Sequence, residues 1–209
     1  EKLQGSIESL GFLQKFKVFG ADGVYGGFKT HGEYGDKVGK LSVFAFYDHV
    51  SADSQPMGNY FRATGASTGS NTTGPLRSAT TQTPVSGVFR TPTLNGSDSV
   101  MYGDSGTTAV TDNLFKIKAQ YEFSSDLVGR AMFTILDHKE SLSNPKTYMR
   151  DANGNPVWGG TFQHNGVAFT ALNSNFSETR LERQGIDAGV GLKGNLAAGW
   201  KFDSVFSLY

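Results

Sequence analysis

Residues 113–123 (NLFKIKAQYEF) alternate between two chemistries, and this alternation constrains the fold more than any other feature of the sequence. The apolar parity holds Phe115, Ile117, Ala119, Tyr121 and Phe123. The polar parity holds Lys116, Lys118, Gln120 and Glu122. A period of two predicts a β-strand with two unlike faces. The apolar face must then meet either the core of a soluble protein or the lipid around a membrane barrel.

The same alternation recurs along the chain and predicts an all-β protein. Most of the predicted segments contain about ten residues, which is the span of a tilted membrane strand. The segment at the start of the chain has a poor period, and we predict it to be a strand as well. The seven predicted strands lie near 3–17, 26–34, 40–50, 113–123, 127–137, 183–193 and 199–209.

The connections between these segments differ greatly in length, and short and long ones alternate. Short turns are predicted at 35–39, 124–126 and 194–199, and long polar loops at 51–112 and 138–182. The connection near 18–25 is intermediate. In an up-and-down antiparallel barrel, alternate connections lie on the same side, and outer-membrane barrels have short periplasmic turns and long extracellular loops. We therefore predict part of an antiparallel up-and-down transmembrane β-barrel.

Composition excludes several classes of function. The chain has no cysteine, and its four histidines form no metal-binding spacing. Its 19 basic and 19 acidic residues balance, so charge gives no reason to expect nucleic acid as a partner. No run approaches the ~18 apolar residues of a membrane-spanning helix. We expect no catalytic site, no metal site and no cofactor, and therefore no enzyme.

Two short motifs invite a chemical interpretation that we do not favour. Asp137, His138 and Ser141 suggest a catalytic triad, but such groups arise by chance in polar segments, and sequence proximity does not give triad geometry. Residues 151–155 (DANGN) resemble the start of a calcium loop. The downstream glutamate of an EF-hand is missing, and Asn-Gly is a strong turn signal, so we predict a turn there.

Five segments resemble TonB-dependent outer-membrane receptors. They are EKLQGSIESLGFLQKF, GVYGGFKTHGEYGDKVGKLSVFAFYDHVSADSQP, LFKIKAQYEFSSDLVGRAMFTILDH, TYMRDANGNPVWGG and GLKGNLAAGWKFDSVFSLY. The resemblance implies location in the outer membrane of a Gram-negative cell and import of a scarce nutrient such as a siderophore, haem or cobalamin. It also implies a barrel of twenty-two strands, an N-terminal plug and a TonB energy-coupling protein that acts through that plug.

The chain departs from this family pattern in three ways. It shows neither plug nor coupling box, it has about seven strands, and Ser207 stands where a terminal outer-membrane strand usually has an apolar residue. We therefore interpret it as an N-terminal portion of the barrel. Two alternatives from other classes remain: a passive porin or adhesin-type barrel, and a soluble secreted β-sandwich that acts as a binding module.

The barrel interpretation assigns roles to two groups of residues, with lipid and a small-molecule or metal-complex ligand as the partners. Aromatic and arginine side chains in the long loops are the ligand-binding candidates, because such side chains grip a ligand with few contacts. These candidates are Tyr60, Arg62, Arg90, Tyr102, Trp158 and His164. The residues expected to face the lumen are Lys116, Lys118, Gln120, Glu122, Arg130, Asp187 and Lys193.

Overall fold

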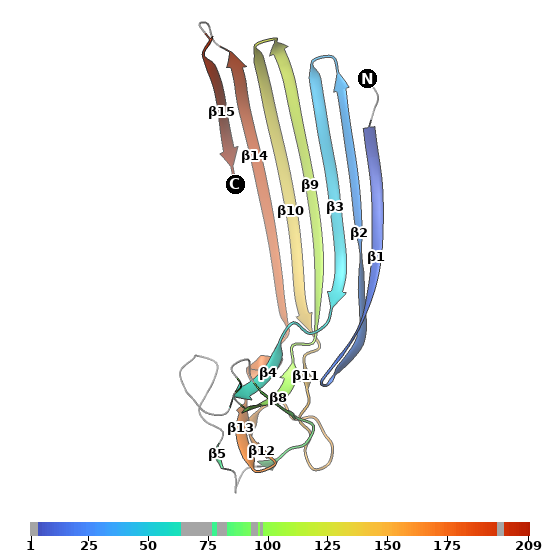
Figure 1. Cartoon of the computed structure of the whole chain (residues 1–209), viewed down its shortest axis with the longest axis vertical. Helices are drawn as coiled ribbons and strands as arrows, with labels where there is room; N and C mark the ends of the chain where they lie inside the picture. The colour runs from blue at the N-terminus through green and yellow to red at the C-terminus, as the bar shows by residue number, and fades with distance from the viewer. Residues whose placement is uncertain (1–3, 64–76, 79–82, 93–95, 97, 196–198) are drawn as a thin grey trace.

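The computed structural model describes residues 4–63, 77–78, 83–92, 96, 98–195 and 199–209, and its main element is a seven-stranded antiparallel sheet (Figure 1). Successive strands of this set are paired with each other, so their order across the sheet follows their order along the chain. The strands, in order across the sheet, are β1 (Gln4–Val18), β2 (Ala21–Val38), β3 (Leu41–Ser54), β9 (Thr107–Ser124), β10 (Leu127–Ser143), β14 (Thr179–Asn195) and β15 (Lys201–Leu208). The all-β, antiparallel expectation is confirmed. Among the described residues the sheet is open and forms no closed barrel.

The strands extend well beyond the predicted segments. β2 and β9 each contain 18 residues, and β10 and β14 each contain 17. The extra length is largely polar and its few apolar residues do not alternate regularly, so no apolar alternation predicts it. Consequently the predicted long loops 51–112 and 138–182 are too wide, because β3, β9, β10 and β14 occupy their ends.

The connection predicted near 18–25 is a tight turn. Val18 pairs with Ala21, so only Phe19 and Gly20 link β1 to β2. Phe19 has φ of 51°, in the left-handed region that a turn of this kind requires. The glycine-rich run after Phe19 carries little periodic signal, which is why strand β2 was predicted to begin five residues too late.

The described parts of the two long connections fold together into a lobe at one end of the sheet, whereas the turns β2–β3 and β9–β10 lie at the other end (Figure 1). The lobe comprises the described residues of 55–106 and 144–178. It contains two small sheets and one 3₁₀ turn. Its elements are β4 (Asn59–Ala63), β5 (Arg77–Ser78), β6 (Thr83–Pro84), β7 (Phe89–Pro92), β8 (Asp98–Asp104), β11 (Lys146–Thr147), β12 (Gly160–His164), β13 (Val167–Ala171) and η1 (Asn173–Phe176).

A hydrophobic core lies inside the lobe and joins its two connections. Val100 from the first connection and Met149 from the second are both 0% exposed. The buried cluster comprises Val85, Val88, Val100, Tyr102, Met149, Phe162, Phe169 and Ala171. Outside the lobe, the buried apolar residues that the structure describes are Ala21 and Tyr25, at the end of β2 nearest the lobe. The large sheet therefore has no core of its own over most of its length.

The tip of the β1–β2 hairpin docks on the lobe. The rings of Phe19 and Phe89 lie 5.6 Å apart, and a Cβ on Gly20 would lie 2.4 Å from the ring of Tyr148. The hydroxyl of Tyr148 donates a 2.6 Å hydrogen bond to Asp104, which is fully buried. This packing ties the first hairpin to the connections that build the lobe.

In the part of the chain that the structure describes, no helix has the length and apolar character needed to cross a bilayer.

Candidate functional site

One face of the large sheet carries a belt of apolar side chains. Residues directly opposite each other in paired strands share a face, so the register defines rows across the sheet. Across β3, β9, β10, β14 and β15, the four rows of the belt are Tyr47, Phe115, Ile135 and Ile186; Ala45, Ile117, Phe133, Ala188 and Leu208; Val43, Ala119, Ala131, Val190 and Phe206; and Leu41, Tyr121, Gly129, Leu192 and the hydroxyl residue Ser204. The five apolar residues of the segment 113–123 thus share a face with the apolar residues of four neighbouring strands.

The belt ends abruptly on the side nearest the lobe. The next row on the same face, which we call the polar row, is His49, Asn113, Asp137 and Gln184. The hydroxyl of Tyr47, at the edge of the belt, donates a 2.7 Å hydrogen bond to the side-chain oxygen of Asn113. Nδ1 of His49 lies 2.8 Å from the same oxygen. The boundary therefore falls at the same level on four adjacent strands.

The side chains of the belt are exposed. Ile186 is 49% exposed, Val190 59% and Phe206 69%. Soluble monomers rarely expose contiguous apolar patches of this kind, and such patches mark contact with a membrane or another protein. The belt is therefore a candidate interaction surface.

The opposite face, which we call the polar face, is mostly polar, although Phe44, Phe46, Leu114 and Leu136 also lie on it, and the register brings together on it all seven residues predicted to face a lumen. Gln120 pairs with Arg130, Lys116 with Thr134, and Thr134 in turn with Asp187, all on this side of the sheet. Two of the seven residues form ion pairs there: Glu122 with Lys37, at 3.0 Å, and Arg130 with Asp203. By contrast, Lys116 and Lys118 make no hydrogen bond or ion pair with any described residue.

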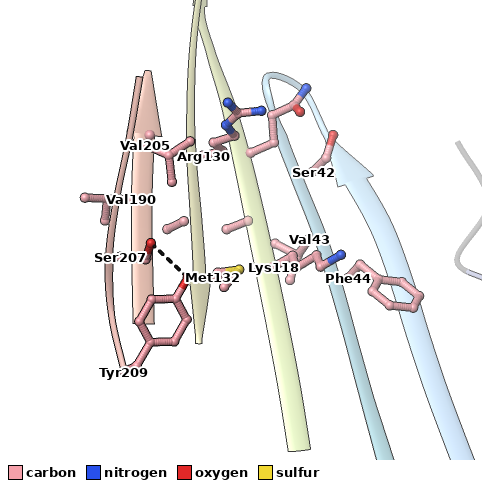
Figure 2. Close-up of a pocket in the computed structure, with 15 residues that line it drawn as sticks. Ser42, Val43, Phe44, Lys118, Arg130, Met132, Val190, Val205, Ser207 and Tyr209 are labelled. Carbon is pink, nitrogen blue, oxygen red and sulfur yellow. Dashed lines mark hydrogen bonds between the residues drawn. The ribbon is translucent and has the colours of Figure 1, made fainter. Parts of the chain in front are cut away.

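A groove of about 530 Å³ lies on the polar face near the hairpin turns (Figure 2). Its rim includes Lys118, Arg130, Met132 and Val205, from β9, β10 and β15. Gly189 and Gly191 of β14 belong to its lining and have no side chain to fill it. The groove therefore combines charged, hydroxyl and apolar groups in one concavity.

All six predicted ligand residues lie in the lobe, but two of them are buried. Tyr102 is 3% exposed and Arg62 is 3% exposed, so the expectation of exposed loop side chains is wrong for both. Burial raises the pKa of the Tyr102 hydroxyl and lowers the pKa of the Arg62 guanidinium. The Tyr102 hydroxyl accepts a 2.7 Å hydrogen bond from Asn175. These two side chains contribute to the interior of the lobe.

Three other candidates make contacts that order the lobe and stay at least partly accessible. Arg90 forms an exposed ion pair with Asp98, with Nε 3.2 Å from the carboxylate. Nδ1 of His164 donates a 3.0 Å hydrogen bond to the carbonyl of Val85. Trp158 is 41% exposed.

Phe176 links Trp158 to Tyr60, the sixth candidate. The ring of Phe176 lies edge-on to Trp158 at 5.2 Å and to Tyr60 at 5.3 Å. The sequence analysis missed Phe176, because a single aromatic residue in a polar loop gives no periodic signal. Trp158, Phe176 and Tyr60 form an aromatic cluster in the lobe.

The structure does not assemble the two chemical motifs considered above. His138 projects from the opposite face of β10 to Asp137 and binds Asp112 instead, with Nδ1 2.5 Å from the carboxylate. The Asp151 carboxylate accepts hydrogen bonds from the backbone N–H groups of Asn155 and Asn153, each at 2.8 Å. These bonds hold the pKa of Asp151 below its usual value. Residues 151–155 are the predicted turn, and among the described residues no cluster could hold a metal ion.

Three features of the structure bear on function: the belt, the polar face with its groove, and the lobe. No family model matches the chain, and no curated protein or solved structure matches it.

Proposed function

We propose that the seven-stranded sheet is part of the wall of a β-barrel in the outer membrane of a Gram-negative bacterium. The barrel imports a scarce nutrient in the manner of a TonB-dependent receptor. The observation that carries the proposal is the belt, with its exposed apolar rows ending at one polar row across four strands. In water such a surface is unfavourable by about 25 cal/mol for each Å² exposed. In lipid it is the expected surface, so a membrane explains why the sheet has no core.

The height of the belt supports the proposal. From Phe115 to Phe123 the strand β9 makes eight residue steps, which is about 27 Å of strand at ~3.4 Å per residue, or about 21 Å of height at the tilt of about 40° usual in barrels. Transmembrane barrels carry an apolar band about 25 Å tall, with aromatic residues at its borders. Tyr47 and Phe115 lie at the border near the lobe, and Tyr121 lies at the border near the turns.

The two edges of the sheet indicate that more strands complete the wall. Among the described residues, β1 and β15 each pair on one side only. Each unpaired backbone group in lipid costs several kcal/mol, which is why membrane sheets close into barrels. We infer that further strands pair with both edges, and that the polar face then faces the interior of the barrel.

In this proposal the lobe recognises the ligand on the extracellular side. It is built from the long connections, which outer-membrane barrels place outside the cell. Its aromatic cluster and Arg90 provide stacking surfaces and a cation for a siderophore, haem, cobalamin or similar complex. Transport would need no chemical step by this chain, and energy would come from a TonB protein acting through a plug domain.

The test uses the full-length protein in a Gram-negative host. We expect it to fractionate with the outer membrane and to migrate differently on a gel before and after heating. Its ligand uptake should stop when the energy-coupling protein is deleted. A freely soluble product would contradict the barrel, and uptake without the coupling protein would favour the passive porin instead.

A further inference from the structure

We propose that the tip of the β1–β2 hairpin is a releasable latch, which fixes the position of the lobe relative to the large sheet when it is seated against Phe89 and Tyr148. The structure shows the seated state. The proposal does not depend on a membrane, because it concerns a contact between two parts of this chain. In the proposed barrel, the latch would set where the lobe lies relative to the mouth.

The lobe is joined to the sheet through a narrow neck. The chain passes between the two regions at 55–58, 105–106, 144–145 and 177–178. Hydrogen bonds hold these passages close together: the backbone N–H of Ser105 donates to the carbonyl of Gly58 at 2.8 Å, and the backbone N–H of Asn144 donates to the Glu178 carboxylate at 3.0 Å. A body held at one narrow neck can tilt about it, so a second attachment decides its position.

The second attachment is a two-stranded ribbon, the part of the β1–β2 hairpin nearest its tip. Pairing of β2 with β3 ends at Gly27 and Ala52, whereas pairing of β2 with β1 continues to Ala21 and Val18. Beyond Gly27 the hairpin therefore has no third strand among the described residues, and it curves toward the lobe (Figure 1). A Cβ on Gly27 would lie 2.5 Å from the carbonyl oxygen of Ser51, so glycine is required where the ribbon leaves the sheet. Because two-stranded ribbons are only marginally stable alone, this ribbon can bend without breaking the pairs of the other strands.

The seat for the tip is an aromatic surface of the lobe. The ring of Phe19 packs on the ring of Phe89, and Gly20 lies directly against the ring of Tyr148. Tyr25 is buried at the same end of the hairpin, whereas Phe19 stays 44% exposed. The contact is therefore small and mainly apolar, and the tip is only partly covered by the lobe.

The lobe is complete without the tip. The buried cluster that forms its core contains no residue of the hairpin. The buried carboxylate of Asp104 accepts hydrogen bonds from the hydroxyl of Tyr148 at 2.6 Å and from the backbone N–H of Gly106 at 2.8 Å, and both donors belong to the lobe. Release of the tip therefore leaves the core and the buried carboxylate of the lobe intact. A contact between two self-sufficient parts can open on its own, with a free energy below that of global unfolding.

The experiment is pulsed electron–electron double resonance on the full-length protein in detergent. Spin labels are attached to two introduced cysteines, Asp53→Cys at the end of the sheet and Asn153→Cys in the lobe; the given chain has no cysteine of its own. We expect the seated distance to dominate, with roughly 1–10% of molecules at a second, released distance. Gly20→Ala should raise the released fraction about tenfold, because overpacking of this kind typically costs 1–3 kcal/mol. The added Cβ would lie 2.4 Å from the ring of Tyr148, which is itself buried and cannot move aside.

Two further variants make the result specific. Gly11→Ala is the matched control, since it lies in the same hairpin and its Cβ would be an ordinary 4.0 Å from the carbonyl oxygen of Gly27. Phe19→Asn removes the ring that packs on the lobe and keeps a residue suited to the left-handed φ of 51°. We expect Phe19→Asn to raise the released fraction as well, and Gly11→Ala to leave it unchanged. Hydrogen exchange at Val100 and Met149 should be the same in all variants.

Two results would overturn the proposal. An unchanged distance distribution in both Gly20→Ala and Phe19→Asn would mean that the neck alone fixes the lobe. Faster hydrogen exchange throughout the core of the lobe in these variants would mean that the tip is part of the fold of the lobe and is no latch. Neither result bears on the proposed barrel, which fractionation of the same full-length protein tests separately.

Discussion

The lobe and the sheet use apolar residues in opposite ways. In the lobe, side chains such as Val100 and Met149 point inward and are fully buried. In the sheet, Ile186, Val190 and Phe206 point outward and stay exposed. The lobe is therefore stabilised by its own packing, whereas the sheet relies on its backbone hydrogen bonds and on what surrounds the belt. The same chain thus contains one region suited to water and one suited to an apolar solvent.

The largest expected effect is the loss of lobe packing in Met149→Ala. The substitution leaves a cavity in a closed core, and buried Met→Ala changes cost about 2–5 kcal/mol. Hydrogen exchange of the lobe amides in the full-length protein measures this cost. The matched control is Ile186→Ala in the belt, where lipid can fill the space, and we expect about 1 kcal/mol or less there. Equal costs at both positions would mean that the belt is packed against protein.

The second prediction compares the same kind of substitution on the two faces of strand β9. Ala119→Arg puts a charge in the belt near its middle, which costs about 2–4 kcal/mol on the lipid face of a membrane barrel. Gln120→Arg, one residue along on the polar face, should change little because its side chain stays in water. Folding into lipid vesicles under urea titration gives both free energies. A greater cost for Gln120→Arg would reverse the assignment of the faces.

The smallest effect is the alkaline sensitivity of the lobe. Burial, and then the hydrogen bond to Asp104, raise the pKa of Tyr148 above its usual 10.0, and burial raises the pKa of Tyr102 as well. The folded lobe holds these protons more tightly than the unfolded chain does. Its stability is therefore unaffected below pH 10 and falls as the pH rises above 10.

Tyrosinate absorbance and lobe hydrogen exchange, followed together as pH rises, measure this sensitivity. Tyr148→Phe removes the titrating hydroxyl and should flatten the pH dependence, although it lowers stability at neutral pH by leaving Asp104 without that donor. Ionisation of all lobe tyrosines near their usual pKa, with no opening of the lobe, would contradict the prediction.

The faces of the sheet could be predicted from the sequence, and the lobe could not. Alternation is a local signal, so Phe115 and Lys116 fall on opposite sides wherever β9 lies, and alternating connection lengths were enough to order the strands. The core of the lobe joins Val100 to Met149, which lie far apart in segments without any period. The burial of Arg62 and Tyr102 follows from that long-range packing, and no local pattern announces it.

The polar ends of the strands separate the lobe from the belt. Between Asn113 and Thr107, β9 makes six further residue steps, about 20 Å of strand at ~3.4 Å per residue. At the tilt of about 40° usual in barrels, this lifts the lobe by about 15 Å. If the belt lies in the hydrocarbon, that distance clears the headgroup layer, which is roughly 5–8 Å thick on each side. Antibodies, phage and proteases outside the cell would therefore meet the lobe first, and variation under such pressure should concentrate there.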